Sequence, residues 1–451
     1  MRITRNDMDF LPAIVQSYAQ QRSMINFLKK SEYWTDQQWY QYQLQQLQKL
    51  INHCFEHVTY YKKISNRYGI KTEDIKTLSD LENFPFLTRN IVRLHTNELK
   101  ADNYPKKSFE RKQTSGTSNH PLSIYLEKNT WLAYHIAFNR IFMQRAGYKR
   151  WKKTISLVGI QEKSKIHRLF RTLELSSLYL HKNYEGVIKN IKKYQPEFIV
   201  SYPSAIYFLA KYLNENKKLS TINVSAVFCH GEPVYEWQRK SIEQAFSCRV
   251  FDIYGNGEKS VISATCEKSY LHHVFPNYCI VELINAQGNP VTTEGEKGEI
   301  VTTSLLSYIY PFIRYRTGDV GIFTKKQCSC KRHYPLIKQI TGRLQDGVVT
   351  KNNEVINSSR INQVVAMNSA GVIKWQFIQK KKGKLQLYLV KNKQKNDSES
   401  IIKTGIKNAF LDEFSNEFDL SIQFVHNINQ NRSRKHEFLI QHLPVNIING
   451  L

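Results

Sequence analysis

Two neighbouring motifs hold residues whose types and spacing could bind a nucleotide. YPFIRYRTGDVG, residues 310–321, contains an Arg-x-Thr-Gly-Asp turn that ends at Asp319. ITGRLQDG, residues 340–347, follows about twenty residues later and contains Arg343 and Asp346. A carboxylate can accept hydrogen bonds from two hydroxyls, as on a ribose, and an arginine can bind a phosphate. The pair predicts a nucleotide site beside a hinge, although each motif alone could be a capped turn with a surface arginine.

A loop rich in small hydroxyl residues could hold phosphate groups. The stretch KQTSGTSNHPLSIY covers residues 112–125. Hydroxyls and backbone amides can converge on an anion where a glycine leaves the backbone without side-chain bulk. Such loops are common, so this one carries weight only together with other motifs. The candidate residues are Thr114, Ser115, Gly116, Thr117 and Ser118.

Two further stretches offer an aromatic ring, a carboxylate and a late lysine. FDIYGNGEKS, residues 251–260, places Tyr254 after a strand-like run, where its ring could stack on a purine. Glu258 could hold Mg²⁺, which takes few protein carboxylates and prefers phosphate oxygens and water. In NRSRKHEFLI, Lys435 lies in a basic loop before an apolar strand. The plain alternatives are a solvent-facing glutamate in a turn and an exposed lysine.

Cysteine and histidine residues form a second constellation. Cys266 precedes His272 and His273, and Cys328 and Cys330 lie together in QCSCKRH. Three cysteines and one histidine complete a tetrahedral shell for structural zinc, with no position left open for catalysis. The alternative is two unrelated turns with free thiols.

The elements that must position these residues follow an α/β pattern. Four short apolar runs occur, and helical patterns lie between most of them. The runs are 154–160, 197–203, 224–233 and 249–256. That alternation indicates parallel strands, with ligands bound beyond their carboxyl ends. Helices are expected from Tyr33 to about Ser65 and over 129–145. YCIVELI and EIVTTSLL are typical of antiparallel strands.

The composition changes after Arg343. The segment that follows has short strands, many lysines and an amphipathic pattern near 399–413. We therefore expect a large N-terminal domain, residues 1–341, and a small α+β domain, residues 342–451. The lysine run at 380–384 indicates a hairpin tip.

Charge and cysteine content narrow the classes of protein. The net charge is +27, from 65 Lys and Arg against 38 Asp and Glu, which favours anionic partners without choosing among them. The chain has seven cysteines, and an odd number argues against a disulfide framework. Neither a run of about 18 apolar residues nor the apolar core of a signal peptide is present, so we expect a cytoplasmic protein without a transmembrane segment. Peripheral contact with an anionic membrane stays open.

The order of the motifs resembles that of the adenylate-forming enzymes. More narrowly, the chain is similar to the phenylacetate–CoA ligase family, in its branch of capsule-biosynthesis CapK-like and coenzyme F390 synthetase-like proteins. LENFPFLTRNIV, SYPSAIYFLAKYL and HGEPVYEWQRKSIEQAF also look like that branch. The resemblance extends from about Tyr33 to Leu443. It implies a large adenylation domain with parallel sheets and a small mobile C-terminal α+β domain that acts as a lid.

The resemblance also implies residue roles. Residues 114–118 would wrap the phosphates of ATP, Glu258 would hold Mg²⁺, and Lys435 would stabilise charge as a carboxylate attacks the α-phosphate. His273 would be the zinc-binding histidine rather than His272, with His333 as a spare candidate on the surface. The other contacts with the nucleotide would come from Glu232, Tyr254, Gly255, Asn256, Asp319 and Arg343, with Asp346 at the hinge.

The implied function is an ATP-dependent ligase. It would activate a carboxylic acid as acyl-AMP, release pyrophosphate, and pass the acyl group to CoA or another acceptor, such as a sugar or a carrier in surface-polysaccharide production. Three positions depart from the family pattern. The family has Gly at the position of Asn119, often Lys at that of His120, and usually Gly at that of Arg434. These departures motivate the alternative of a non-catalytic scaffold or binding protein with the same fold. Nucleic-acid binding has no motif behind it and is not expected.

Overall fold

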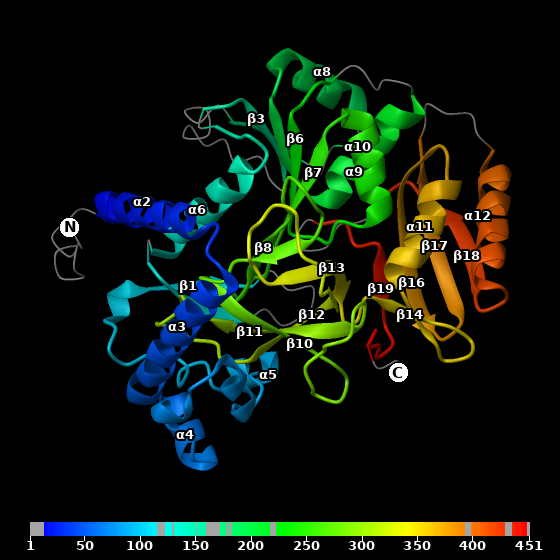
Figure 1. Ribbon diagram of the computed structural model, residues 1–451. Coiled ribbons are helices and arrows are strands. Elements are labelled where there is room, and N and C mark those ends of the chain that lie inside the picture. Colours follow the sequence, from blue (N-terminus) through cyan, green and yellow to red (C-terminus); the bar gives the residue numbers. More distant parts are fainter. Residues whose placement is uncertain are drawn as a thin grey trace.

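The structure is a computed structural model that describes residues 13–114, 122–128, 130–149, 151–158, 172–176, 180, 183–216, 222–392, 398–428 and 435–448. Figure 1 shows N-terminal helices on one side, a large sheet in the middle and a smaller C-terminal unit on the other side. Thr114 falls within the described residues. The rest of the expected phosphate loop, Ser115, Gly116, Thr117 and Ser118, lies outside them, as do Asn119, His120 and Arg434.

Helices at the N-terminal side differ in one respect from the expectation. The helix expected from Tyr33 to about Ser65 is two helices that meet at Val58, whose extended φ of −121° ends the first. Thr35 and Gln38 form a capping box, which satisfies free amides at the start of the first helix. The bounds are α2 (Ala13–Ser31), α3 (Asp36–His57), α4 (Thr59–Tyr68) and α5 (Arg89–Leu94).

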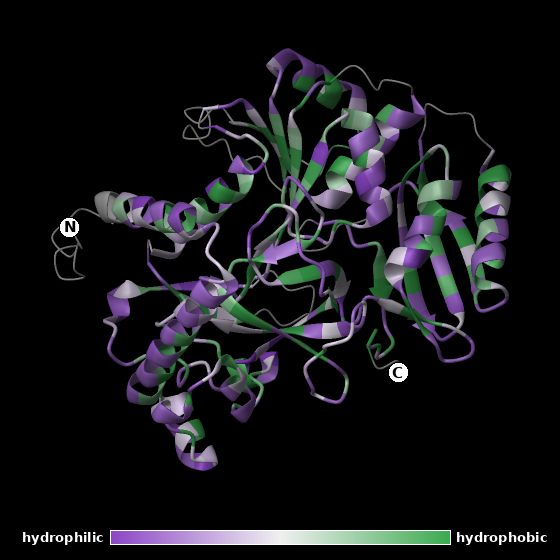
Figure 2. Ribbon diagram, viewed as in Figure 1, coloured by the Kyte–Doolittle hydropathy of each residue, from purple (hydrophilic) through white to green (hydrophobic). Residues whose placement is uncertain are grey.

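The described residues form an eleven-stranded sheet in the order β10-β11-β12-β13-β9-β8-β7-β6-β5-β3-β4. Its parallel half confirms the four expected strands. Buried aliphatic side chains such as Ile199, Val227 and Val250 fill this half, as a sheet covered on both faces requires. The apolar strands are green in Figure 2. The parallel strands are β3 (Thr154–Val158), β4 (Thr172–Ser176), β5 (Phe198–Ser201), β6 (Ala226–His230) and β7 (Arg249–Gly255).

Helices connect and cover the parallel strands. Tyr207, Leu209 and Ile242 bring buried apolar faces against the sheet in one core cluster. The strands and helices alternate along the chain, which is the α/β arrangement predicted from the sequence. The helices are α6 (Thr130–Gln144), α8 (Tyr184–Tyr194), α9 (Pro203–Glu215) and α10 (Glu236–Phe246).

The other half of the sheet is antiparallel and includes the expected pair of strands, β10 and β11. Short strand β9 joins the two halves. It pairs with β8 through two residues and with β13 through two residues. A hairpin of β1 (Phe109–Gln113) and β2 (Ser123–Glu127) lies outside this sheet. The remaining bounds are β8 (Ile262–Ala264), β9 (His272–Val274), β10 (Cys279–Ile284), β11 (Lys297–Ser304), β12 (Tyr315–Phe323) and β13 (Leu336–Arg343).

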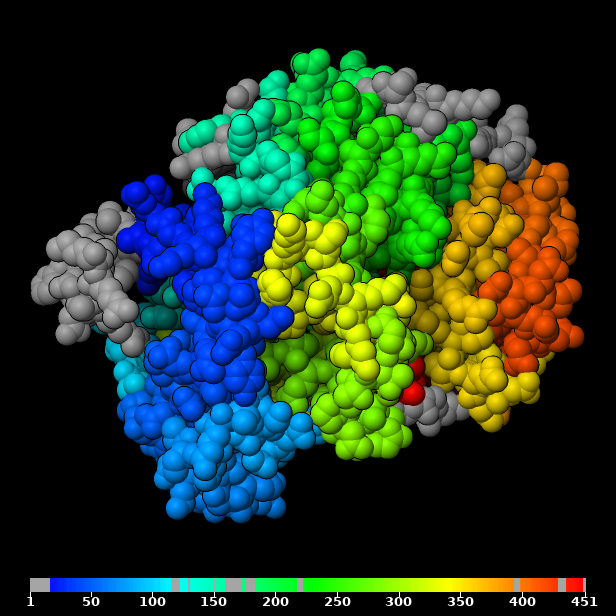
Figure 3. Space-filling model, viewed as in Figure 1, coloured from blue at the N-terminus to red at the C-terminus, as the bar shows by residue number. Residues whose placement is uncertain are grey.

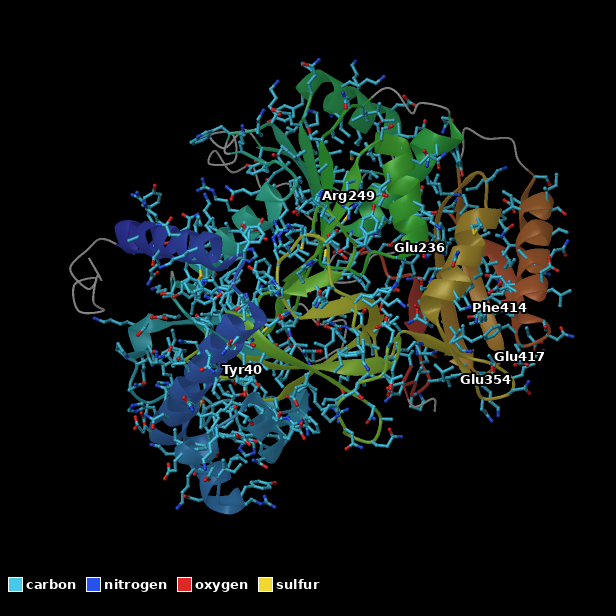
Figure 4. The ribbon with its side chains drawn as sticks, in the orientation of Figure 1. Tyr40, Glu236, Arg249, Glu354, Phe414 and Glu417 are labelled. Carbon is cyan, nitrogen blue, oxygen red and sulfur yellow. The ribbon has the colours of Figure 1, made fainter. Side chains whose placement is uncertain are left out.

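The C-terminal domain has a four-stranded sheet in the order β18-β17-β16-β19, covered by helices. The lysine run at 380–384 is the tip of the β16–β17 hairpin, as expected. Figure 4 labels Phe414 and Glu417 at the outer end of this domain, where Glu417 accepts a 3.3 Å hydrogen bond from the amide of Asn352. The elements are β14 (Gly347–Val349), β15 (Val355–Asn357), α11 (Ser358–Asn368), β16 (Val372–Lys381), β17 (Lys384–Lys391), α12 (Glu399–Phe414), β18 (Asp419–Phe424) and β19 (Leu439–Gln441).

Aromatic side chains pack the C-terminal domain against α9 and α10. The ring of Trp375 on β16 lies 5.5 Å from that of Phe208 and 6.1 Å from that of Trp237. Figure 3 shows the orange C-terminal domain directly against the green helices. The boundary expected at residue 341 falls inside β13 and stays a prediction. Among the described helices, none combines the length and the apolar character that a membrane crossing needs.

Candidate active site

Asp319 and Arg343 face each other across two strands of the sheet. They are register partners on β12 and β13. The hydroxyl of Tyr254, at the end of β7, donates a 2.8 Å hydrogen bond to Asp319 Oδ2, and Arg343 Nε lies 3.8 Å from Asp319 Oδ1. The motifs that contain Asp319 and Arg343 therefore meet the tyrosine motif at one place.

A buried glutamate shapes the turn that presents Asp319. Glu299 on β11 accepts hydrogen bonds from Arg316 Nε at 2.6 Å and from the amide of Gly318 at 3.0 Å. Gly318 has a φ of +75°, which a residue with a side chain rarely adopts. The arginine and the glycine of the Arg-x-Thr-Gly-Asp motif therefore set the geometry of the turn, and Asp319 is left to face the site.

Burial dominates the electrostatics of Asp319. It raises the pKa of this carboxyl to about 6, while the positive charge of Arg343 and the hydrogen bond from Tyr254 act in the opposite direction. A carboxylate in this setting is ionised at neutral pH and has lone pairs that can accept hydrogen bonds from further donors. Two hydroxyls of a ribose would supply such donors.

Asp346 fixes the chain just beyond Arg343. Its Oδ2 accepts a 2.8 Å hydrogen bond from the amide of Arg343. Gly342 has a φ of +114°, and a Cβ at this position would lie 2.6 Å from Asp346 Oδ2. Glycine is required there because a side chain would displace the carboxylate. The hinge role expected for Asp346 stays a prediction, but the residue does sit where β13 leaves the large sheet.

Glu258 and Thr114 are joined by Arg89, a residue that was not predicted from the sequence. Arg89, at the start of α5, donates to Glu258 Oε1 at 2.5 Å and to Thr114 Oγ1 at 3.0 Å. Tyr315 also donates to Glu258, at 3.2 Å, and the Glu258 side chain is only 9% exposed. Glu258 is thus not the solvent-facing turn residue of the plain alternative. Arg89 lies in LENFPFLTRNIV, but a single arginine has no spacing that signals a role.

Glu232 lies under the first turn of α9. It accepts hydrogen bonds from the amide and the hydroxyl of Ser204, at 3.0 and 3.1 Å. A carboxylate is stabilised at a helix N-terminus by the free amides and the helix dipole. Burial nevertheless raises its pKa. The nucleotide contact expected for Glu232 stays a prediction, and its hydrogen bonds to Ser204 place it at the start of α9.

Lys435 enters the site from the C-terminal domain. Its ammonium donates a hydrogen bond to the carbonyl of Gly231 and lies 5.6 Å from the centre of the Tyr202 ring. Burial lowers its pKa, while the charge of Glu232 raises it. Gly231 leaves room for the ammonium, because a Cβ there would lie 3.1 Å from Lys435 Nζ. Lys435 is thus not the exposed lysine of the plain alternative.

A cavity of about 490 Å³ opens beside Lys435. Gly255 and Asn256 contribute to its wall, and Asn256 Oδ1 accepts a 2.9 Å hydrogen bond from the amide of Ser260. Aromatic side chains from α6, β6 and the segment after β9 also line the cavity. Examples are Trp131, Phe138, Phe142, Phe228 and Tyr278.

The predicted zinc ligands come together. The ligand atoms of Cys266, His273, Cys328 and Cys330 all lie within 4.8 Å of one another. Cys266 Sγ is 3.5 Å from Cys328 Sγ, and Cys330 Sγ is 3.2 Å from His273 Nε2. Ligands around a tetrahedral zinc are about 3.5–3.8 Å apart at ordinary bond lengths, so the donor set fits the metal.

The surroundings of the cluster also suit a metal. Amides of Lys268 and Ser269 donate to Cys266 Sγ, each at 3.3 Å, and Leu271 O accepts from His273 Nδ1 at 2.9 Å, which leaves Nε2 for a metal. His272 points elsewhere: its Nε2 lies 3.3 Å from Asp252. The alternative of two unrelated turns does not describe this arrangement.

A large mixed sheet followed by a small α+β domain, with the site at their junction, is the fold of the adenylate-forming ligases. A crystal structure of 2-hydroxyisobutyryl-CoA ligase in the postadenylation state, in complex with 2-HIB-AMP, matches with a TM-score of 0.73 at 18% identity. The match covers 92% of this chain and 91% of that one. The same ligase in the thioesterification state gives 0.57.

More narrowly, residues 348–442 match the model of the CapK C-terminal domain. Protein CapK of Staphylococcus aureus is 21% identical over 90% of this chain and 89% of its own length. Phenylacetate-coenzyme A ligase of Pseudomonas putida is 26% identical over 72% of this chain and 75% of its own length. The homologues are thus CapK and phenylacetate–CoA ligases, which confirms the resemblance and the expected enzyme class.

Proposed function

We propose that the protein is an ATP-dependent ligase that converts a carboxylic acid to an acyl-adenylate and passes the acyl group to a thiol, with CoA as the first candidate. One observation carries this: Lys435, on one domain, lines a cavity whose wall on the other domain includes Tyr254. Tyr254 in turn binds Asp319. An ammonium, a hydroxyl-binding carboxylate and a pocket for an acid are the parts that this reaction needs.

The first half-reaction needs fixed positive charge at a crowded phosphorus. An oxygen of the acid attacks the α-phosphorus, and the bond to pyrophosphate breaks. In this proposal Asp319 accepts the ribose hydroxyls, Arg343 binds ribose or phosphate, and Lys435 stabilises the negative charge that develops at the phosphorus. Burial lowers the pKa of Lys435, while the negative charges of Glu232 and Asp319 act in the opposite direction.

Magnesium fits the residues around Glu258. Mg²⁺ is usually held by one or two carboxylates together with substrate phosphates and water. Glu258 supplies one carboxylate, and Arg89 and Thr114 bring further donors to phosphate oxygens at the same place. When bound, the ion would neutralise phosphate charge. We propose this role for Glu258, with residues 114–118 around the phosphates.

In the second half-reaction a thiolate attacks the carbonyl carbon of the acyl-adenylate, and AMP leaves. Lys435 would then have to withdraw so that the acceptor can enter. The closer match to a postadenylation structure supports a first pose with Lys435 inside, followed by rotation of the C-terminal domain. The similarity to protein CapK supports a second kind of acceptor, a sugar or a carrier in capsule production.

The cavity favours an acid with a large apolar body. A cavity of about 150 Å³ lined by apolar side chains takes one benzene ring, and this one has about three times that volume. Burial lowers the pKa of His230 to about 4, so this cavity histidine is neutral at pH 7. A sugar acid would leave many hydroxyls against aromatic walls, which is unfavourable.

We also propose structural zinc at Cys266, His273, Cys328 and Cys330. A hydrogen bond from Cys330 lowers the pKa of the Cys266 thiol, and the nearby His273 acts in the same direction. The cluster therefore stabilises a thiolate, which is the form that binds zinc. The site would tie β9 to the connection between β12 and β13.

The decisive experiment measures pyrophosphate release with ATP, Mg²⁺ and a panel of phenylacetate, benzoate, octanoate and 2-hydroxyisobutyrate. Release that depends on one of the acids is expected, and addition of CoA should yield the thioester. Silence across this panel, together with no ATP binding by calorimetry, would support the non-catalytic scaffold instead. Adenylate trapped by hydroxylamine but no thioester would keep the first half-reaction and reject CoA as acceptor.

A further inference from the structure

Lys259 is a second lysine on the wall of the acid cavity. It follows Glu258 in the turn after β7 and has a φ of +60°, a left-handed conformation that a residue with a side chain seldom adopts. Such strain persists where the surrounding structure imposes it, and it often marks a functional position.

Several hydrogen bonds hold the turn in this shape. Asn256 Oδ1 accepts from the amide of Ser260 at 2.9 Å, and Asn256 Nδ2 donates to Ser260 Oγ at 2.8 Å. The hydroxyl of Tyr278 donates to the carbonyl of Lys259 at 2.9 Å. The backbone therefore fixes the direction in which the Lys259 side chain leaves the turn, which is into the cavity.

The ammonium of Lys259 rests on an aromatic wall. Its Nζ lies 4.6 Å from the centre of the Trp131 ring, a cation–π distance. Among the residues that the structure describes, no carboxylate forms an ion pair with it. Glu258 is close enough to raise its pKa, but Arg89 already binds that carboxylate. Burial, the largest influence, lowers the pKa of Lys259.

The carboxylate of the substrate could supply the negative charge that pairs with Lys259. An adenylate-forming ligase must bring a carboxylate beside the phosphates of ATP, and like charges oppose that approach. We propose that Lys259 binds the carboxylate of the acid in the ground state and directs it toward the α-phosphate, while Lys435 acts on the phosphoryl transition state. This inference rests on the proposed function. It assigns the two lysines of the cavity to different steps.

The test separates acid binding from nucleotide binding. With the acid from the panel that releases most pyrophosphate, Lys259→Met should raise KM for the acid about tenfold or more and leave KM for ATP unchanged. Lys259→Arg should keep most of the affinity. Lys240→Met is the matched control, because Lys240 is an exposed lysine on α10 that does not line the cavity. That control should behave like the unmodified protein.

A second measurement reports binding without turnover. Phenylacetamide, benzamide, octanamide or 2-hydroxyisobutyramide, chosen to match the best acid, lacks the charge and should bind at least about tenfold more weakly than the acid to the unmodified protein. In Lys259→Met the acid should lose this advantage. An unchanged preference, or a rise in KM for ATP instead of the acid, would overturn the role of Lys259. Absence of pyrophosphate release from the unmodified protein would instead count against the proposed function.

Discussion

Lys435 reaches the cavity from a different domain than the residues around it, and its contacts there define its proposed role. Its ammonium contacts the carbonyl of Gly231, and the charge of Glu232 raises its pKa. Nothing in the local sequence NRSRKHEFLI distinguishes this lysine from an ordinary exposed one. Its position became predictable only through the order of the motifs along the whole chain.

Replacing Lys435 with alanine should abolish adenylate formation but leave ATP binding nearly intact. Removal of one preorganised charge from a transition state typically costs about a hundred- to a thousandfold in rate. Pyrophosphate release would measure the first effect and calorimetry the second. Lys384→Ala, at the exposed hairpin tip, is the matched control. Normal turnover by the Lys435 variant would remove this residue from the mechanism.

Asp319 should make ATP binding depend on pH in one direction. Its pKa is raised to about 6, so the carboxylate is ionised above that pH and protonated below it. Through this group alone, we expect the Kd for ATP to be about tenfold higher at pH 5 than at pH 7, which means weaker binding at pH 5. The pKa of Asp319 in the folded protein exceeds the ordinary value of an aspartate, so protonation of Asp319 stabilises the folded, ATP-free protein. The expected loss of ATP affinity at low pH is therefore not an effect of unfolding caused by Asp319.

Asp319→Asn supplies the control for this pH dependence. The phosphates of ATP also titrate, but they do so equally with both proteins. The difference between the two calorimetric pH profiles therefore isolates Asp319. Parallel profiles would show that its ionisation does not contribute to nucleotide binding.

At the scale of elements, the parallel strands were predictable because each is a short apolar run that ends in turn residues. The break between α3 and α4 was not, because the apolar pattern continues through Val58 while its backbone becomes extended. Arg89 was also missed. Its contact with Glu258 depends on the pairing of Leu87 with Tyr315, which brings the start of α5 to β12. Such long-range contacts leave no periodic signal in the sequence.

The cysteine cluster should contain about one zinc per chain, and its loss should lower the melting temperature. Elemental analysis of the purified protein checks the first point. Cys328→Ser should release the metal and lower Tm by several degrees, because a structural zinc contributes directly to folding. Cys248→Ser is the control, since Cys248 is outside the cluster. A metal-free protein with all its thiols titrating freely would reject the site.

At the scale of the whole molecule, contacts between the domains hold Lys435 in place. The ring of Phe208 on α9 lies 5.2 Å from that of His436, the residue after Lys435, and 5.9 Å from that of Phe438. The two-domain composition was visible in the sequence, but this docking was not, because it joins aromatic residues more than two hundred positions apart.

Phe208→Ala should slow the first half-reaction more than the second. Loss of the ring weakens the pose that brings Lys435 to the cavity, and we expect pyrophosphate release to fall by about tenfold, or about 1.4 kcal/mol. Thioester formation from a supplied acyl-adenylate should change little. The two rates are measured separately, in single-turnover experiments. An equal fall in both would indicate general damage to the fold, and no fall would show that Phe208 does not govern docking.

The geometry of the nucleotide site depends on the short strand β9. It joins the two halves of the large sheet through two residue pairs on each side. Tyr254 and Glu258 belong to one half, and Asp319 and Arg343 to the other. The nucleotide would therefore be bound across a narrow seam, and the cysteine cluster crosses the same seam through His273. Without metal, the two halves should open as separate cooperative units in hydrogen exchange, and affinity for ATP should fall before the protein unfolds.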